Sequence, residues 1–222
     1  MRKPVVDYRQ LRPNNISSPQ YRHLFWLLGW VGYFILYFLT ENLIPPEKCT
    51  PVHIWLDDVI PFCEWFLIPY VLWYGLIAFS LGYFALYNID SFKKLSKYIF
   101  ITQMVAMAIY ILFPSRQDLR PEVFPRENFL TWCIGLIYSF DTSTGVCPSL
   151  HVAYSIGIAS VWLREKGVKV IWKVLLVVLV ILICLSTMFI KQHSATDFFA
   201  ALPVCALAEI LVFCNPFHKR KR

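Results

Sequence analysis

Apolar residues in this chain gather into six long runs without a charged residue, and shorter polar segments separate these runs. The runs cover residues 24–40, 65–89, 98–115, 142–163, 174–190 and 198–208. A helix of about 18–20 apolar residues is long enough to cross the hydrocarbon core of a bilayer. The pattern therefore predicts six membrane-spanning helices. The last one reaches full length only if Glu209 is accommodated near its inner end.

The composition agrees with a membrane protein. Hydrophobic residues make up 58% of the 222 residues, and the mean hydropathy is +0.54. A soluble domain of this length needs a mostly polar surface, which this composition excludes. We expect an all-α integral membrane bundle of six transmembrane helices. Residues 23–215 would form one domain, between a cytoplasmic segment at 1–22 and a basic cytoplasmic tail at 216–222.

The basic residues indicate the orientation. Sixteen of the 21 Lys and Arg lie in the segments that share a side with the two termini. The opposite segments contain Lys48, Arg116, Arg120, Arg126 and Lys191. The positive-inside rule then places both termini in the cytoplasm. The net charge of +7 lies beside anionic lipid headgroups and needs no nucleic acid partner to explain it.

Seven cysteines form no Cys-x-x-Cys pair, so the spacing typical of thiol redox or zinc sites is missing. Four of them, Cys49, Cys63, Cys133 and Cys147, fall on or near the outer side. Either a disulfide forms there or these residues are small buried apolar side chains.

Three connections face outward. The first, residues 44–60, contains an amphipathic stretch that we expect at the membrane interface, together with Asp57, Asp58 and Glu64. The longest, residues 116–147, contains "NFLTWCIGLIYSF", which is too apolar for disorder and predicts an interfacial helix or a lid. The third, at 191–196, is a tight turn.

Polar residues that are hard to explain as solvated loop gather on this outer face. They are Arg116, Arg120, Ser149, His151, Lys191, His193 and Asp197. The fourth and sixth spans begin here, so their unpaired N–H groups and positive dipole ends face outward, with Pro148 at a first helical position. Two helix starts with Arg and Lys predict an anion site, and phosphate is the natural ligand.

Within this site, His193 and Asp197 are four residues apart and share a helix face. A carboxylate on one ring nitrogen leaves the other nitrogen free to attack, and His151 could act as a general acid. Other interpretations stay open. Ser194 and Asp197 fit a capping box, His151 could bond to backbone near a helix start, and Lys191 and the arginines could contact headgroups.

Two segments resemble a known family. "CPSLH" at 147–151 and "STMFIKQHSATD" at 186–197 resemble the second and third signature motifs of the type-2 phosphatidic acid phosphatase superfamily. Those motifs read Pro-Ser-Gly-His, and Ser-Arg, five residues, His, three residues, Asp. The first motif, Lys, six residues, Arg-Pro, is matched only at Arg120-Pro121. Phe113, Leu150 and Thr187 stand where the family has Lys, Gly and Arg.

The resemblance implies a catalytic domain that uses no metal and no cofactor. His193 would form a phosphohistidine, Asp197 would orient it and His151 would protonate the leaving group. Arg120 and Ser149 would hold phosphate oxygens. We expect Lys191 and Arg116 to restore the positive charge that the altered motifs lack.

The resemblance further implies a lipid phosphatase that hydrolyses a phosphomonoester or diphosphate lipid, either a phospholipid or an isoprenoid phosphate. The Pro-Ser-x-His variant is most similar to the branch of inositol phosphorylceramide synthases, so a lipid phosphotransferase is an alternative. A non-catalytic lipid-binding relative and a haem protein with His151 and His193 as axial ligands are further alternatives. The resemblance places the protein in a bacterial plasma membrane with an extracytoplasmic site.

Overall fold

The computed structural model describes residues 4–214, so the predicted tail at 216–222 lies outside the described residues. Six helices build the main body: α1 (Leu28–Leu43), α3 (Leu67–Tyr87), α4 (Ile89–Leu112), α6 (Leu150–Arg164), α7 (Val170–Phe189) and α8 (Ala195–Phe213). Smaller elements are α2 (Trp55–Val59), α5 (Phe129–Phe140) and the parallel strands β1 (Thr50–Pro51) and β2 (Ser115–Arg116). Short 3-10 helices cover Tyr8–Gln10, Arg22–Leu27, Pro46–Lys48 and Glu64–Phe66.

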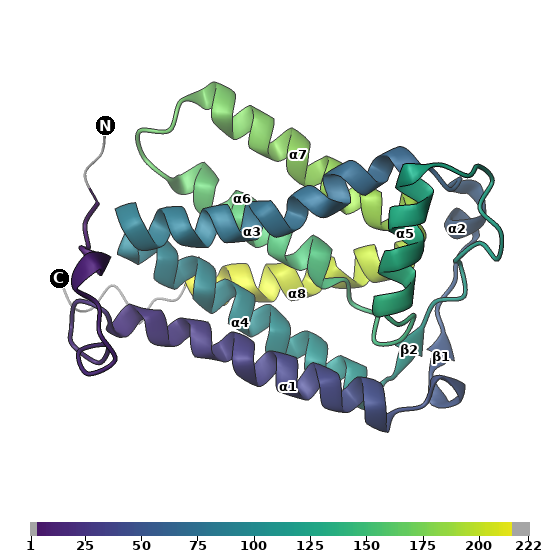
Figure 1. Cartoon of the computed structure of the whole chain (residues 1–222), viewed down its shortest axis with the longest axis horizontal. Coiled ribbons are helices and arrows are strands. Elements are labelled where there is room, and N and C mark those ends of the chain that lie inside the picture. The colour runs from purple at the N-terminus through teal and green to yellow at the C-terminus, as the bar shows by residue number, and fades with distance from the viewer. Residues whose placement is uncertain (1–3, 215–222) are drawn as a thin grey trace.

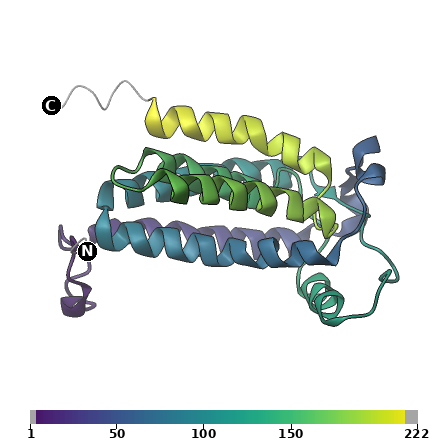
Figure 2. The same cartoon turned by 90° about the horizontal axis from the view of Figure 1, so that it is seen from above.

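The six long helices lie side by side along the long axis of the molecule (Figures 1 and 2). The small elements α2, α5, β1 and β2 all lie at one end, which we call the capped end (Figure 1). The amino-terminal segment and the last turn of α8 lie at the opposite end. The described chain therefore starts and finishes at the same end of the bundle.

The centre of the bundle is formed by α4 and α6, which pack on each other and on α8. Aromatic side chains such as Tyr98 and Tyr154 are almost fully buried there. Because α6 is enclosed by α3, α4, α7 and α8, its side chains are shielded on most sides. This central position allows α6 to present a polar residue inside the bundle.

Five helices of the described chain are long and apolar enough to cross a membrane: α1 and α3 with their preceding 3-10 turns, α4, α7 and α8. The sixth, α6, has 15 residues. At a rise of 1.5 Å per residue it spans about 22 Å, less than the ~30 Å hydrocarbon core. The protein is thus a helical bundle with five candidate spans, and the count of six spans stays a prediction.

The predicted apolar run at 142–163 becomes helical only at Leu150. Gly145 takes a positive φ of 61°, and the Ser149 side chain accepts from the backbone N–H of Val152 to cap the helix. Pro148 therefore precedes the helix, and the prediction that it occupies the first helical position is wrong. The shift shortens α6 and leaves residues 142–149 as a loop at the capped end.

The other end shows how α8 accommodates an acidic residue. Its helix runs to Phe213 and includes Glu209, whose carboxylate pairs with Arg164. The Ser160 hydroxyl donates to the second oxygen of Glu209 at 2.7 Å. The last helix reaches full length, as the sequence required, because Glu209 is accommodated by an ion pair with Arg164 on α6.

Two of the three acidic residues expected at an interface are instead buried at the capped end. Glu64 is 2% exposed and accepts from the Arg126 guanidinium at 3.1 Å. Asp57 is 3% exposed and binds the start of α8. Only Asp58 is exposed, paired with His53. Glu64 and Asp57 thus have partners that the sequence did not reveal, because these partners lie far along the chain.

Candidate active site

The turn between α7 and α8 carries His193, and Asp197 follows in the first turn of α8. The backbone N–H groups of Gln192 and His193 both donate to the carbonyl of Thr187 on the last turns of α7. Lys191 adopts a φ of 54°, which reverses the chain. This local structure places His193 just before the start of α8, as the tight turn in the sequence predicts.

Asp197 is fully buried and holds this histidine. Its Oδ2 lies 3.0 Å from Nδ1 of His193 and also accepts from the backbone N–H of Ser194 at 3.0 Å. Ser194 and Asp197 thus form the capping box of α8, while the same carboxylate orients the histidine. The two interpretations of the Ser-x-x-Asp spacing are both correct.

The third residue, His151, approaches from the first turn of α6. Its Nδ1 lies 3.3 Å from Nε2 of His193. Because the carboxylate accepts a hydrogen bond from Nδ1–H of His193, Nε2 keeps its lone pair and faces His151. The rings of Trp73 and Tyr70 pack against His151 with centroids 4.1 and 4.8 Å away, which fixes its plane.

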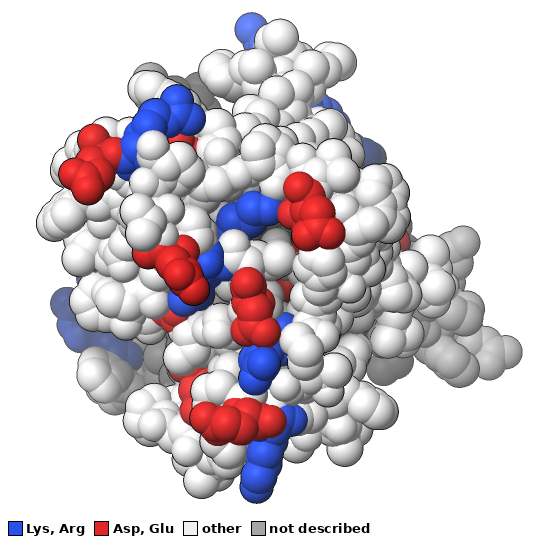
Figure 3. All heavy atoms as spheres, turned by 90° about the vertical axis from the view of Figure 1, so that its right-hand side faces the viewer, with Lys and Arg blue, Asp and Glu red and all other residues white. Residues whose placement is uncertain are grey.

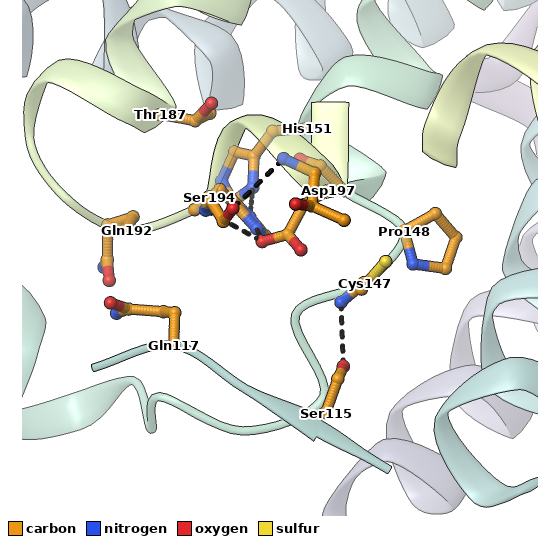
Figure 4. A network of polar contacts seen from close by, with 12 residues as sticks. Ser115, Gln117, Cys147, Pro148, His151, Thr187, Gln192, Ser194 and Asp197 are labelled. Atoms are coloured by element: carbon orange, nitrogen blue, oxygen red, sulfur yellow. Dashed lines mark hydrogen bonds and ion pairs between the residues drawn. The ribbon is translucent and has the colours of Figure 1, made fainter. Parts of the chain in front are cut away.

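Ser149 connects the two helices that carry these histidines. Its backbone N–H donates to the carbonyl of Asp197 at 3.1 Å, and its hydroxyl caps α6. Next to it, the Cys147 N–H donates to the Ser115 hydroxyl (Figure 4). Burial, together with the neighbouring Asp197 carboxylate, raises the pKa of the Cys147 thiol to about 12. This thiol is therefore neutral, and all seven cysteines are unpaired.

Asp57 is a site residue that the sequence did not reveal. One of its carboxylate oxygens accepts from the N–H of Ala195 at 2.7 Å, and the other from the Ser194 hydroxyl at 2.6 Å. Its carboxylate therefore occupies the start of α8, where the sequence predicted phosphate. No periodicity or spacing connects position 57 with position 195, so no sequence signal could have found this contact.

Of the three basic residues predicted to bind phosphate, Lys191 and Arg116 contact neither histidine. Lys191 donates to the carbonyls of Asp57 and Ile60, at 2.9 and 2.6 Å. Arg116 pairs with Asp118 and donates to the carbonyl of Pro46. Both are thus engaged with segments at the capped end rather than with the histidine pair.

Arg120 reaches the site through a neighbour. Its guanidinium donates to the side-chain oxygen of Gln192 at 2.6 Å, to the carbonyl of Tyr138, and lies 4.5 Å over the Tyr138 ring. It thereby fastens α5 to the turn that carries His193. At the capped end, basic and acidic side chains are interspersed over the surface, so it is not a uniformly positive face (Figure 3).

A cavity of about 730 Å³ opens at the histidine pair. Its polar end contains His151, His193, Gln192 and Asp141, and its walls are aromatic and aliphatic side chains of α1, α3 and α5. Asp141 accepts from the Gln192 amide at 3.2 Å and from the Tyr37 hydroxyl at 3.4 Å. Burial raises the pKa of the Asp141 carboxyl, and His193 and Arg120 oppose that rise.

The arrangement suits nucleophilic attack better than haem ligation. A basic nitrogen of His193 is backed by a buried carboxylate and stands beside a second imidazole, at the head of an apolar cavity. Two axial histidines must hold an iron and a porphyrin plane between them. The hydrogen-bond distance of 3.3 Å between His151 and His193 leaves no such space.

Comparison of the chain with protein-family models, curated proteins and solved structures gave no match. A functional assignment therefore depends on the chemistry of these residues and on the resemblance of the two short motifs.

Proposed function

We propose that this protein is a membrane-integral enzyme that removes a phospho group from a lipid through a phosphohistidine on His193. The observation that carries the proposal is the chain of contacts from Asp197 to His193 to His151 at the polar end of an apolar cavity. Resemblance to the type-2 phosphatidic acid phosphatase superfamily supports the same assignment of roles.

In the first step, Nε2 of His193 attacks phosphorus, an N–P bond forms and the P–O bond to the lipid breaks. Asp197 stabilises the positive charge that develops on the imidazole, because its carboxylate already holds Nδ1–H at 3.0 Å. His151 gives its proton to the departing lipid oxygen. In the second step, His151 takes a proton from the acceptor, whose oxygen attacks phosphorus and releases His193.

The acceptor decides the class of reaction. With water the enzyme is a lipid phosphatase, and with a lipid hydroxyl it is a phosphotransferase of the inositol phosphorylceramide synthase type. In both cases, the proposed steps use side chains of the protein alone and require no metal or cofactor. The apolar cavity wall supports a lipid substrate, because burial of an acyl chain stabilises the complex by about 0.8 kcal/mol per CH₂.

We further propose that α6 completes a six-span topology inside the ring of longer helices. Both termini would be cytoplasmic, and the histidine pair would lie at the outer face of a bacterial plasma membrane. The distribution of Lys and Arg supports this orientation. The enclosure of α6 by neighbouring helices supports the sixth span, because a short buried helix need not cover the full lipid thickness alone.

The test is phosphorus transfer by the purified protein in detergent with EDTA present. The panel contains phosphatidic acid, phosphatidylethanolamine, phosphatidylglycerol and an isoprenoid diphosphate, and the assay measures the dephosphorylated lipid. Activity should persist in EDTA and disappear in both His193→Ala and His151→Ala. The control is His53→Ala, an exposed histidine paired with Asp58, which should retain activity.

Acid-labile but base-stable radiolabel on the protein, absent in His193→Ala, would identify the phosphohistidine. Activity that survives in His193→Ala would contradict the proposal. If folded protein binds lipid but releases no product from any substrate, with or without a ceramide or diacylglycerol acceptor, the protein is a non-catalytic lipid-binding relative.

A further inference from the structure

The charges around the cavity do not match a phosphate dianion. Among the described residues that line it, none is Lys or Arg. Its ionisable groups, apart from tyrosine hydroxyls, are the two histidines and the carboxylate of Asp141. Arg120 acts behind Gln192, while Lys191 and Arg116 bind carbonyls elsewhere. A doubly negative phosphomonoester would meet a carboxylate here. The Arg120 guanidinium, which acts on that carboxylate, is already bound to Gln192 and to two backbone carbonyls.

Asp141 lies in surroundings that favour an organic cation. The rings of Tyr33, Tyr37 and Tyr74 line the same cavity, and the Tyr37 hydroxyl contacts the carboxylate. Ring faces attract ammonium groups, and the attraction grows when water is removed. The described partners of Asp141 include two neutral donors, Tyr37 and Gln192, which stabilise its charge less than a direct cation would.

The cavity wall also holds an unused donor. Trp73 is 8% exposed and lines the cavity, and its indole N–H has no acceptor among the described residues. Burial of such a donor is costly unless a ligand accepts its proton. An oxygen of a phosphodiester or of an acyl ester can do so, whereas a purely hydrocarbon ligand cannot.

We propose that the lipid substrate is a zwitterionic phosphodiester, an amino-alcohol phospholipid, whose ammonium group binds at Asp141 among the tyrosine rings. The inference rests on the proposed function. The N–P bond would form on His193 Nε2, and the P–O bond to diacylglycerol would break. The glycerol oxygen would take the proton of His151, and the amino-alcohol phosphate would stay on His193 until water or a lipid hydroxyl displaces it.

The zwitterion matches the cavity in both halves. Its phosphate carries one negative charge, so it costs less to bury than the two charges of a phosphomonoester, and the indole N–H of Trp73 can donate to one of its oxygens. Its ammonium offsets the Asp141 carboxylate, so both buried charges are paired. Phosphatidic acid and phosphatidylglycerol offer no cation, and each adds negative charge to the cavity without a group that can pair with Asp141.

The experiment measures diacylglycerol, a product common to all four donors, from lipids with identical acyl chains. Phosphatidylethanolamine and phosphatidylcholine are compared with phosphatidylglycerol and phosphatidic acid in nanodiscs with EDTA. The wild type should have a kcat/KM at least about tenfold higher for the amino-alcohol lipids. In Asp141→Asn this ratio should fall about tenfold or more, with a rise in the activity on phosphatidic acid.

Two further variants separate recognition from folding. Tyr74 is 55% exposed, so Tyr74→Leu should fold, and it should lower the ratio about threefold while Tyr74→Phe lowers it less. Asp118→Asn, outside the cavity, should keep the wild-type ratio. The inference is overturned if the wild type prefers phosphatidic acid or phosphatidylglycerol, or if Asp141→Asn lowers all four activities equally.

These results are distinct from a failure of the proposed function. Diacylglycerol release that depends on His193 but favours phosphatidic acid removes the inference and keeps the phosphohistidine mechanism. Release that does not depend on His193 removes both.

Discussion

At the scale of single residues, one carboxylate oxygen links the stability of α8 to the chemistry of His193. Oδ2 of Asp197 accepts from the Ser194 N–H and from His193 Nδ1, so the helix start cannot form without also fixing the imidazole. The other oxygen, Oδ1, is buried and has no hydrogen-bond partner among the described residues. A substitution of Asp197 can therefore separate the orientation of His193 from the folding of α8 only if the new side chain has the same shape.

Asp197→Asn keeps that shape and changes the tautomer. The amide NH₂ can donate to Nδ1 of His193, which moves the proton to Nε2 and removes the nucleophilic lone pair. We expect kcat to fall by roughly 10²–10⁴, with a small change in KM, as in hydrolases whose histidine loses its carboxylate. Single-turnover release of diacylglycerol measures this effect. A kcat within threefold of wild type would show that Asp197 only caps α8.

Asp57→Ala tests a residue that acts through the backbone of α8. The variant leaves the Ser194 hydroxyl and the Ala195 N–H without their acceptor. We expect a loss of about 2–4 kcal/mol in stability and, because His193 shifts, an about 10- to 100-fold lower kcat. Thermal unfolding in detergent and kcat are the measurements. The neighbouring Asp58→Ala removes only an exposed pair with His53 and should change neither.

The sequence could predict the candidate catalytic residues but not Asp57 and Asp141, which contact the segment around His193. His193 and Asp197 are four apart, so helix geometry alone brings them together, and the Pro-Ser-x-His motif marks His151. Asp57 and Asp141 bind partners 138 and 51 residues away, respectively. Only tertiary packing determines such contacts. The sequence predicted Lys191 as a phosphate ligand. In the structure its ammonium instead binds the carbonyls of Asp57 and Ile60.

At the scale of elements, the position of α6 depends on close packing with α4. Gly157 of α6 faces the ring of Tyr98, whose hydroxyl donates to the carbonyl of Cys205 on α8. Small residues at such contacts let helices in a membrane approach closely. The contact fixes α6 against α4 and thus sets the height at which His151 meets His193.

Gly157→Ala should disrupt this contact, because a Cβ there would overlap the Tyr98 ring. We expect a loss of about 1–3 kcal/mol from overpacking, visible as a lower melting temperature, and reduced activity as His151 moves. The matched control is Gly75→Ala on α3, where an added Cβ meets nothing within 4 Å. That variant should be neutral or stabilising, because Ala favours the helix. Equal melting temperatures for the two variants would contradict the packing argument.

The charge-free runs in the sequence predicted the long helices, and side-chain caps mark the starts of α4, α6 and α8. The run at 142–163 lost its first eight residues to a loop because Ser149 caps α6. The apolar stretch in the long connection between α4 and α6 became α5, as its composition predicted. Apolar residues can be buried either in lipid or in protein. Hydropathy alone therefore cannot distinguish the loop at 142–149 from the helix that follows it.

At the scale of the whole molecule, the two ends of the bundle differ in a way that predicts membrane orientation. The histidine pair and α5 lie at the capped end, while the described chain begins and ends at the other. Val123 is 82% exposed in the connection before α5, and Lys169 is exposed between α6 and α7. These two positions lie on opposite sides of the membrane if α6 crosses it.

We therefore expect Val123→Cys, in a background with the native cysteines replaced by alanine, to react with a membrane-impermeant maleimide in intact cells. Lys169→Cys should react only after permeabilisation, because the basic segments stay in the cytoplasm. Labelling of both without permeabilisation would contradict the six-span topology. The reverse pattern would keep the span count but place the histidine pair in the cytoplasmic leaflet. The enzyme would then act on lipids of the inner leaflet, and phosphate or amino-alcohol phosphate would be released inside the cell.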